Sequence, residues 1–310
     1  LRDMPLPKGP QENVSIADFF PLFQNIYRLT DDEASVTWAT YSVLQDFAQD
    51  NVRYLELRTT PRNAPETGMT TRSYVEAVLR ALDEWHAGIA TPDKCMQVRL
   101  ILSIDRRSTL DTAMATVDLA ATFRLRGVVG VDLCGNPTAG SFAVFAPAFA
   151  RAHQAGLKVT VHMGEVPANV PEGLDALALN PHRVGHATVL DAATRQALLG
   201  RQIPVEVCLT SNIQCQTVPS YNDHFVKDFA RDNHPFILCT DDKGVFMCSL
   251  SQEYEHLGRV LALSPQALFA LSRQCIDYIF EPDPAIKAQL QAQWDAWRID
   301  HLDKYTPSVA

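Results

Sequence analysis

A histidine and a glutamate lie three residues apart at the end of an apolar, β-branched segment. Residues 158–163 read KVTVHM, and Gly164 and Glu165 follow them. Valine and threonine favour a pleated strand, and Gly164 allows the backbone to turn sharply where that strand ends. We therefore expect His162 and Glu165 at the carboxyl-terminal end of a buried strand. An imidazole placed there can ligate a metal ion, and a carboxylate can transfer protons.

Acidic and imidazole side chains also follow two other apolar segments. Residues 236–240 (FILCT) precede Asp241 and Asp242, and the short segment 183–185 (RVG) precedes His186. In a (β/α)8 barrel the carboxyl-terminal ends of the strands meet on one face, and that face carries the chemistry.

Each of these residues also has an ordinary structural explanation. A histidine at a strand end is commonly a hydrogen-bonded structural residue, the two aspartates can form a turn, and a glutamate can lie beside a helix N-cap. Their joint placement after three different strands favours a functional site. In such a site a metal ion activates water beside a residue that transfers protons.

The rest of the chain alternates between apolar segments of strand length and amphipathic segments of helix length. Continuous apolar strands that alternate with helices are typical of a parallel sheet covered on its outer face. We predict an α/β fold of the TIM (β/α)8-barrel type, with seven strands identified and the first strand missing. The predicted strands span residues 52–57, 98–104, 128–133, 157–163, 183–187, 204–209 and 236–240. The predicted helices span residues 73–86, 110–126, 141–154, 191–199, 221–231, 250–261, 265–279 and 284–300.

Two helices are expected before the first of these strands. One is predicted to begin at Ser15 and to extend through Tyr27, and Thr30 and Glu33 are expected to form a capping box for the next. That second helix is predicted to direct four apolar side chains inward, which are Trp38, Tyr41, Leu44 and Phe47.

Size and composition fit one large domain, predicted over residues 15–310 after a loose arm over residues 1–14. The chain has 310 residues, of which 46% are hydrophobic, and its net charge of −9 argues against binding to nucleic acid. Apolar runs fall short of the ~18 residues that a membrane span needs, and the N-terminus does not resemble a signal peptide. Seven cysteines without a CxxC pair indicate reduced thiols. We expect a cytoplasmic monomer whose partner is a small molecule.

The motifs at the predicted strand ends resemble those of the adenosine/AMP deaminase family of metal-dependent barrels, over most of residues 15–280. His162-Met163-Gly164-Glu165 is similar to the His-Ala-Gly-Glu of that family. Six further segments are most similar to the adenosine deaminase-like branch, which implies deamination of N6-methyl-AMP to IMP and methylamine. These segments are 57–62 (LRTTPR), 67–70 (TGMT), 105–107 (DRR), 132–137 (DLCGNP), 208–212 (CLTSN) and 241–246 (DDKGVF).

The resemblance implies a role for each candidate residue. His162 and Asp241 are expected to ligate Zn²⁺, since a neutral imidazole and a carboxylate suit that ion. Glu165 is expected to move the proton between the attacking water and the leaving amine, while His186 orients the attacking oxygen. Asp242 is expected to hold the purine edge. The resemblance places the purine nucleotide against Thr59, Thr60, Pro61, Arg62, Asp105, Gly135 and Asp242.

Four arginines follow two adjacent predicted strands, an arrangement that favours a phosphorylated substrate. They are Arg58, Arg62, Arg106 and Arg107. Guanidinium groups suit phosphate, but any of these arginines could instead form a structural ion pair with Glu56 or Asp105. Where members of the family have a histidine in the first helix, this chain has Tyr27, which puts one substrate contact in question.

The sequence departs from the family at the first strand, which carries two zinc ligands in a His-x-His motif. No two of the nine histidines stand two residues apart. We expect the chain to be a fragment or an incomplete gene product, because His162 and Asp241 alone would bind zinc weakly. The chain is then expected to have low deaminase activity, whereas the complete protein is expected to be an active deaminase. The alternatives are a deaminase of adenosine or adenine, and a natural variant that binds nucleotide without catalysis.

Overall fold

The computed structural model describes residues 23–88 and 96–302, in which seven parallel strands form one sheet in the order β1-β2-β3-β4-β5-β6-β7. The strands are β1 Tyr54–Thr59, β2 Gln97–Asp105, β3 Val128–Cys134, β4 Lys158–Met163, β5 Arg183–His186, β6 Val205–Val207 and β7 Phe236–Leu238. The prediction of seven parallel strands is therefore confirmed, while the predicted arm over residues 1–14 lies outside the described residues.

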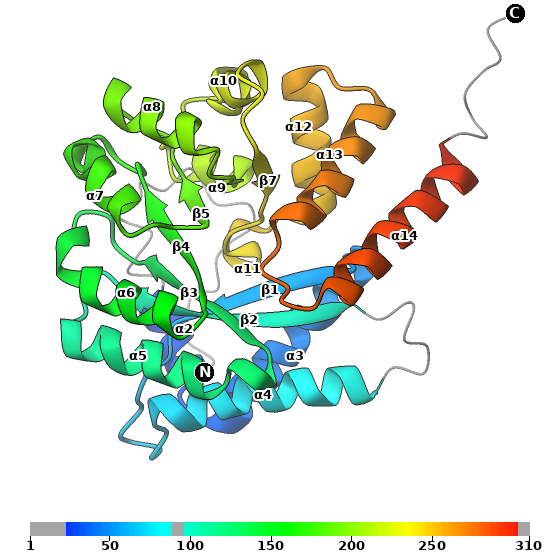
Figure 1. Cartoon of the computed structure of the whole chain (residues 1–310). Helices are drawn as coiled ribbons and strands as arrows, with labels where there is room; N and C mark the ends of the chain where they lie inside the picture. Colours follow the sequence, from blue (N-terminus) through cyan, green and yellow to red (C-terminus); the bar gives the residue numbers. More distant parts are fainter. Residues whose placement is uncertain (1–22, 89–95, 303–310) are drawn as a thin grey trace, which may run out of the picture.

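Helices connect consecutive strands and lie on the outside of the curved sheet (Figure 1). The α-helices are α2 Phe23–Leu29, α3 Glu33–Gln49, α4 Thr71–Ala87, α5 Leu110–Thr122, α6 Ala146–Gln154, α7 Gly173–Ala178, α8 Ala192–Arg201, α9 Leu209–Gln214, α10 Val226–Arg231, α11 Lys243–Phe246, α12 Leu250–Leu261, α13 Pro265–Tyr278 and α14 Pro284–His301. Short 3-10 helices span Arg124–Arg126, Phe142–Phe145, Pro167–Glu172 and Tyr221–Asp223. Among the described helices, none combines the length and the apolar character needed to cross a membrane.

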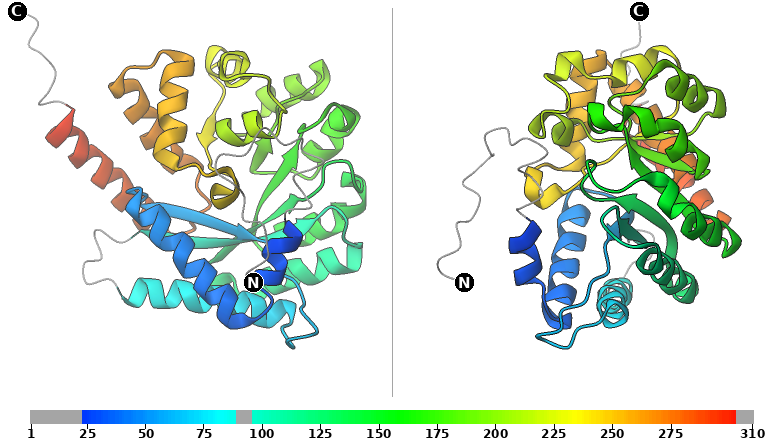
Figure 2. Two further views of the ribbon diagram at one scale, coloured as in Figure 1. Left: turned by 180° about the vertical axis from the view of Figure 1, so that it is seen from behind. Right: turned by 90° about the vertical axis from the view of Figure 1, so that its left-hand side faces the viewer.

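Contacts between strands that are not neighbours show how strongly the sheet curls. Arg58 on β1 donates to Glu206 on β6 at 2.8 Å, and Arg183 on β5 donates to Glu56 on β1 at 2.5 Å. Side chains on these strands can meet only because the sheet curls around an interior, and the views in Figure 2 show this curl. The inward face therefore holds a buried network of charged groups, whereas the outward face packs apolar side chains such as Val159 and Leu100 against the helices.

The start of α3 differs from the prediction in its cap and in its buried face. Asp32 is the N-cap, and its carboxylate accepts from the backbone N–H of Ser35 at 2.7 Å. Thr30 instead donates its hydroxyl to the carbonyl of Ile26. Val36, Thr40, Leu44 and Phe47 are the buried residues of this helix. Trp38 is 73% exposed, because two residues after Val36 the helix has rotated by about 200° away from the core.

Two other segments also differ from the sequence-based expectation. Residues 167–181, for which no helix was predicted, contain the 3-10 helix Pro167–Glu172 and helix α7, which packs Ala176 and Leu177 into the core. The predicted strand 204–209 ends at Val207, because Leu209 already begins helix α9. The apolar character of Leu209 reflects burial in a helix, and periodicity cannot distinguish a short buried helix from a strand.

Candidate functional site

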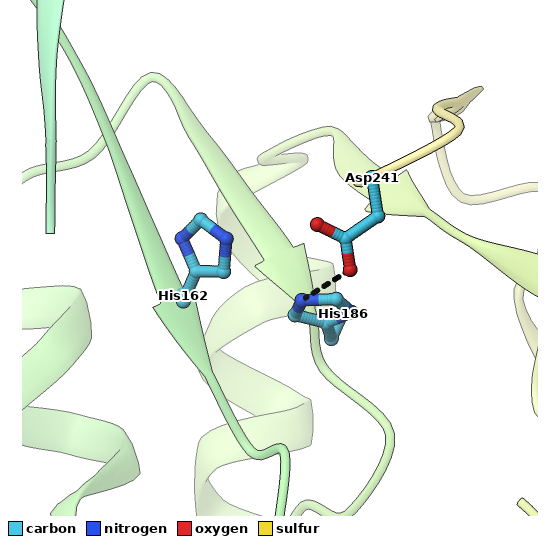
Figure 3. Close-up of side chains that lie close together, drawn as sticks. All are labelled: His162, His186 and Asp241. Atoms are coloured by element: carbon cyan, nitrogen blue, oxygen red, sulfur yellow. Dashed lines mark ion pairs between the residues drawn. The ribbon is translucent and has the colours of Figure 1, made fainter. Parts of the chain in front are cut away.

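Two histidines and an aspartate from three different strands converge at the carboxyl-terminal ends of the sheet. His162 is the penultimate residue of β4, His186 is the last residue of β5, and Asp241 lies just after β7. Their potential ligand atoms all lie within 4.8 Å of one another, and Figure 3 shows the three side chains directed toward a common point. The structure thus brings together His162 and Asp241, the predicted metal ligands, and places His186 beside them.

The backbone at these strand ends adopts left-handed conformations that direct the side chains inward. Gly164 has a φ of 61°, and a Cβ there would lie 2.7 Å from the carbonyl oxygen of Val189. Only glycine fits this turn, as expected from the sequence. His186 has a φ of 60° and Asp241 a φ of 53°, which is unfavourable for residues with a side chain. Such strain is concentrated at sites where the surrounding structure holds functional groups in place.

His162 is oriented by a buried carboxylate on the neighbouring strand. Its Nδ1 lies 3.0 Å from Oδ1 of Asp132 and 3.2 Å from the carbonyl oxygen of Leu133, so Nδ1 carries the proton and Nε2 is left for another ligand. Burial alone would lower the pKa of His162, but Asp132 and Glu165 raise this pKa to about 10. The excess negative charge that retains a proton here also favours a divalent cation.

His186 is in turn held between an amide and two carboxylates. The side-chain amide of Asn212 lies 3.2 Å from Nδ1 of His186, and its nitrogen donates to the ring. Nε2 of His186 then carries the ring proton and lies 3.8 Å from Glu165 and 3.9 Å from Asp241. Ser211 donates its hydroxyl to Asp241 at 2.8 Å. Helix α9 therefore supplies two of the side chains that position the cluster.

Asp242 is half-buried beside this cluster and directly follows Asp241 in the chain. Burial, followed by the charge of Asp241, raises the pKa of Asp242 to about 8. A cation bound at Asp241 would offset the second of these causes. Glu165 is buried, with 9% of its surface exposed, and faces the same space as Asp242.

A single large cavity of about 1480 Å³ connects this cluster to the substrate-binding residues expected from the sequence. Nine of the predicted residues besides Asp241 line it, and these are Thr59, Thr60, Arg62, Asp105, Gly135, His162, Glu165, His186 and Asp242. Pro61 does not line the cavity. Gly135 has a φ of 97°, and a Cβ there would lie 2.8 Å from the carboxylate of Asp105. These two residues therefore form a tight wall of the cavity.

The four arginines of the sequence have separate roles. Arg58 lies in the interior of the sheet and pairs with Glu206 at 2.8 Å, and Arg106 is 2% exposed and pairs with Glu172 at 2.7 Å. Arg107 pairs with Asp105 at 2.5 Å. A structural role thus explains three of the four arginines, and only Arg62 has no ion-pair partner within residues 23–88 and 96–302.

Sequence reasoning assigned no role to Asp132, Ser211 or Asn212, although all three lie in the motifs DLCGNP and CLTSN. Each is buried and acts by holding one of the clustered residues. Their position next to predicted strand ends could have indicated such a role, because a polar residue buried there is rarely left without a hydrogen-bond partner.

A curled parallel sheet with imidazole and carboxylate groups at its strand ends defines a hydrolytic enzyme of the α/β-barrel class. Within that class, the family model described as adenosine deaminase matches residues 7–297. The chain belongs to the adenosine deaminase family, whose members are hydrolytic deaminases that act on C–N bonds.

Several relatives match nearly the whole chain. An N6-mAMP deaminase of Arabidopsis thaliana is 44% identical over 305 residues, covering 93% of this chain and 85% of that protein. A human N6-methyl-AMP deaminase is 37% identical over 290 residues, covering 91% of this chain and 80% of that protein. The structure of Arabidopsis ADAL complexed with IMP superposes with a TM-score of 0.88 at 44% identity, over 93% of this chain and 84% of that one. The predicted family and barrel fold are confirmed.

Proposed function

We propose that this protein hydrolyses N6-methyl-AMP to IMP and methylamine at the site formed by His162, His186, Asp241 and Glu165. The observation that supports this most strongly is the continuous cavity that joins the clustered imidazole and carboxylate groups to Arg62. Relatives that cover most of the chain carry the name N6-methyl-AMP deaminase, and one is solved in complex with IMP.

The donor groups fit a zinc ion. An imidazole and a carboxylate, those of His162 and Asp241, are ligands that zinc accepts, and their ligand atoms lie within 4.8 Å of each other. His162 and Asp241 would hold the ion, and Asp132 supports this by keeping the Nδ1 proton on His162. When bound, zinc supplies a Lewis acid that lowers the pKa of water.

The side chains around the cluster have different roles in the reaction. Glu165 accepts a proton from the attacking water and delivers a proton to the amine that leaves purine C6. His186 donates from Nε2 and thereby orients the attacking oxygen, a role supported by the amide of Asn212 at its other ring nitrogen. Asp242 holds the purine edge. Thr59, Thr60, Asp105 and Gly135, which line the cavity, would complete the nucleotide pocket.

Replacing Arg62 with alanine is expected to weaken nucleotide binding selectively. The guanidinium of Arg62 lines the cavity and has no carboxylate partner among the described residues. A charge-assisted bond to phosphate contributes roughly 1.5–3 kcal/mol. We expect the KM for N6-methyl-AMP to rise by about 10- to 100-fold, with little change for N6-methyladenosine. Release of methylamine, measured as a function of the concentration of each substrate, provides the test.

The matched control for this experiment is Arg28→Ala, which removes an exposed arginine of helix α2 outside the cavity. It is expected to leave both substrates unaffected. Equal turnover of phosphorylated and unphosphorylated substrates by the wild-type protein would contradict a nucleotide deaminase and favour a nucleoside or adenine deaminase.

Replacing Asp132 with asparagine is expected to weaken zinc binding by about 10- to 100-fold, because the carboxylate that fixes the Nδ1 proton of His162 is lost. Competition with a chromophoric chelator measures the affinity directly. Ser103→Ala removes only the 3.1 Å hydrogen bond from a serine to the same carboxylate and serves as the control. If asparagine and aspartate at position 132 gave equal zinc affinity, the assignment of His162 as a ligand oriented by Asp132 would be wrong.

A further inference from the structure

The guanidinium of Arg62 lies between two aromatic rings. Its central carbon is 4.9 Å from the ring centroid of Tyr27 and 5.0 Å from that of Tyr74. Both distances are within the range in which a cation is attracted by the face of an aromatic ring. The two tyrosines come from helices α2 and α4, which are far apart in sequence, so the tertiary structure creates this arrangement.

Hydrogen bonds fix one edge of the same guanidinium. Nη2 of Arg62 donates to the carbonyl oxygen and to the hydroxyl of Thr30, immediately after helix α2. Within the described part of the chain, Nε and Nη1 have no hydrogen-bond partner. An arginine held by its rings and by one nitrogen therefore keeps the N–H groups of Nε and Nη1 as charge-assisted donors for phosphate oxygens.

The tyrosines are themselves held in place. Tyr74 is 7% exposed, and its hydroxyl lies 2.6 Å from Oγ1 of Thr59, a residue that lines the cavity. Tyr27 is half-buried and lies near Arg107, whose guanidinium is already engaged by both oxygens of Asp105. Burial and packing thus restrict both rings before a ligand binds.

We propose that Tyr27 and Tyr74 act as positioning residues that give the site its specificity for a purine nucleoside bearing a 5′-phosphate. The two rings hold the cationic group of Arg62 in one orientation before the ligand arrives, and this reduces the entropic cost of binding the phosphate. The proposal rests on the proposed function, in which Arg62 contacts the phosphate.

A pair of substitutions at Tyr27 separates the contribution of the ring from that of the hydroxyl. Tyr27→Leu removes the ring face from a half-exposed position, and Tyr27→Phe keeps the ring but loses the hydroxyl. We expect Tyr27→Leu to weaken binding of AMP by about three- to tenfold with the affinity for adenosine changed less than about twofold. Tyr27→Phe is expected to retain most of the wild-type preference for AMP.

Titration calorimetry of the full chain with AMP and with adenosine measures both affinities, and the thermal unfolding midpoint verifies that each variant is folded. Arg28→Ala, on the same helix, is the control for a nonspecific change in charge. If Tyr27→Leu preserved the preference for AMP, or if Tyr27→Phe lost it as fully as Tyr27→Leu, the role assigned to the ring would be wrong. A wild-type protein without any preference for AMP would instead contradict the phosphate contact of Arg62, which the proposed function requires.

Discussion

Glu165→Gln is expected to lower the turnover of N6-methyl-AMP by about 10²- to 10⁴-fold, the range over which general acid–base catalysis contributes. Glutamine has nearly the same shape as glutamate but cannot accept a proton from water or return one to the amine. The carboxylate of Glu165 is buried and lies 3.8 Å from Nε2 of His186, so no solvent group can readily replace it. The rate of methylamine release at saturating substrate measures the effect.

Binding and folding should be retained in this variant, because the substitution conserves side-chain volume. The dissociation constant for IMP and the zinc content distinguish a lost proton transfer from a collapsed site. Asp175→Asn makes the same carboxylate-to-amide change at an exposed position of helix α7 and should have wild-type turnover. Turnover by Glu165→Gln within tenfold of the wild-type rate would show that another group moves the proton.

The convergence of His162, His186 and Asp241 could be predicted from the sequence because it depends on a simple geometric property. In a parallel sheet every strand points in the same direction, so residues that directly follow apolar strands gather at one edge. The prediction required only the strand ends, and these were located to within a few residues for β4, β5 and β7.

The separate roles of the four arginines could not be predicted from the sequence in the same way. Arg58 and Arg62 are four residues apart, yet Arg58 lies within β1 and points into the sheet interior, while Arg62 lies beyond the strand in the cavity. Which of several acidic residues pairs with each arginine depends on side chains from distant strands, such as Glu206 for Arg58. Proximity in the sequence therefore did not distinguish the three arginines that form ion pairs from Arg62.

The interior charges connect the fold to the candidate site. Glu206 holds Arg58 at 2.8 Å, and Arg58 lies 3.7 Å from Asp132, which in turn is 3.0 Å from His162. Arg58 offsets part of the charge of Asp132 in a buried place, next to the hydrogen bond that Asp132 makes with His162. A residue deep in the sheet thus contributes to the position of a predicted metal ligand.

Glu206→Gln is expected to reduce the free energy of unfolding by about 3–5 kcal/mol at pH 7, the cost of removing one member of a buried ion pair. Glu206 is 2% exposed and accepts from Arg58, from Arg183 at 2.8 Å and from Thr160 at 3.1 Å. Glutamine leaves the two guanidinium groups without this charge in the interior. Urea-induced unfolding followed by circular dichroism provides the measurement, and a loss below 1 kcal/mol would show that water or Glu56 compensates.

The same substitution should also change the dependence of stability on pH. Burial alone would raise the pKa of Glu206, but Arg58 and Arg183 lower this pKa to about 2. The unfolded chain titrates near pH 4.3, so this stabilisation is fully present above that value and is lost as the pH falls toward 2. We therefore expect the difference in stability between wild type and Glu206→Gln to shrink as the pH falls from about 4.3 to about 2.

Glu253 provides a control with the opposite expected sign. It is fully buried without an arginine partner among the described residues, and its carboxylate accepts from the backbone and the hydroxyl of Thr210. Burial raises the pKa of Glu253 above its ordinary value. The folded protein then binds the proton more readily than the unfolded chain, so acidification stabilises the wild type relative to Glu253→Gln. If both variants responded to pH in the same direction, the arginines could not be what holds the pKa of Glu206 low.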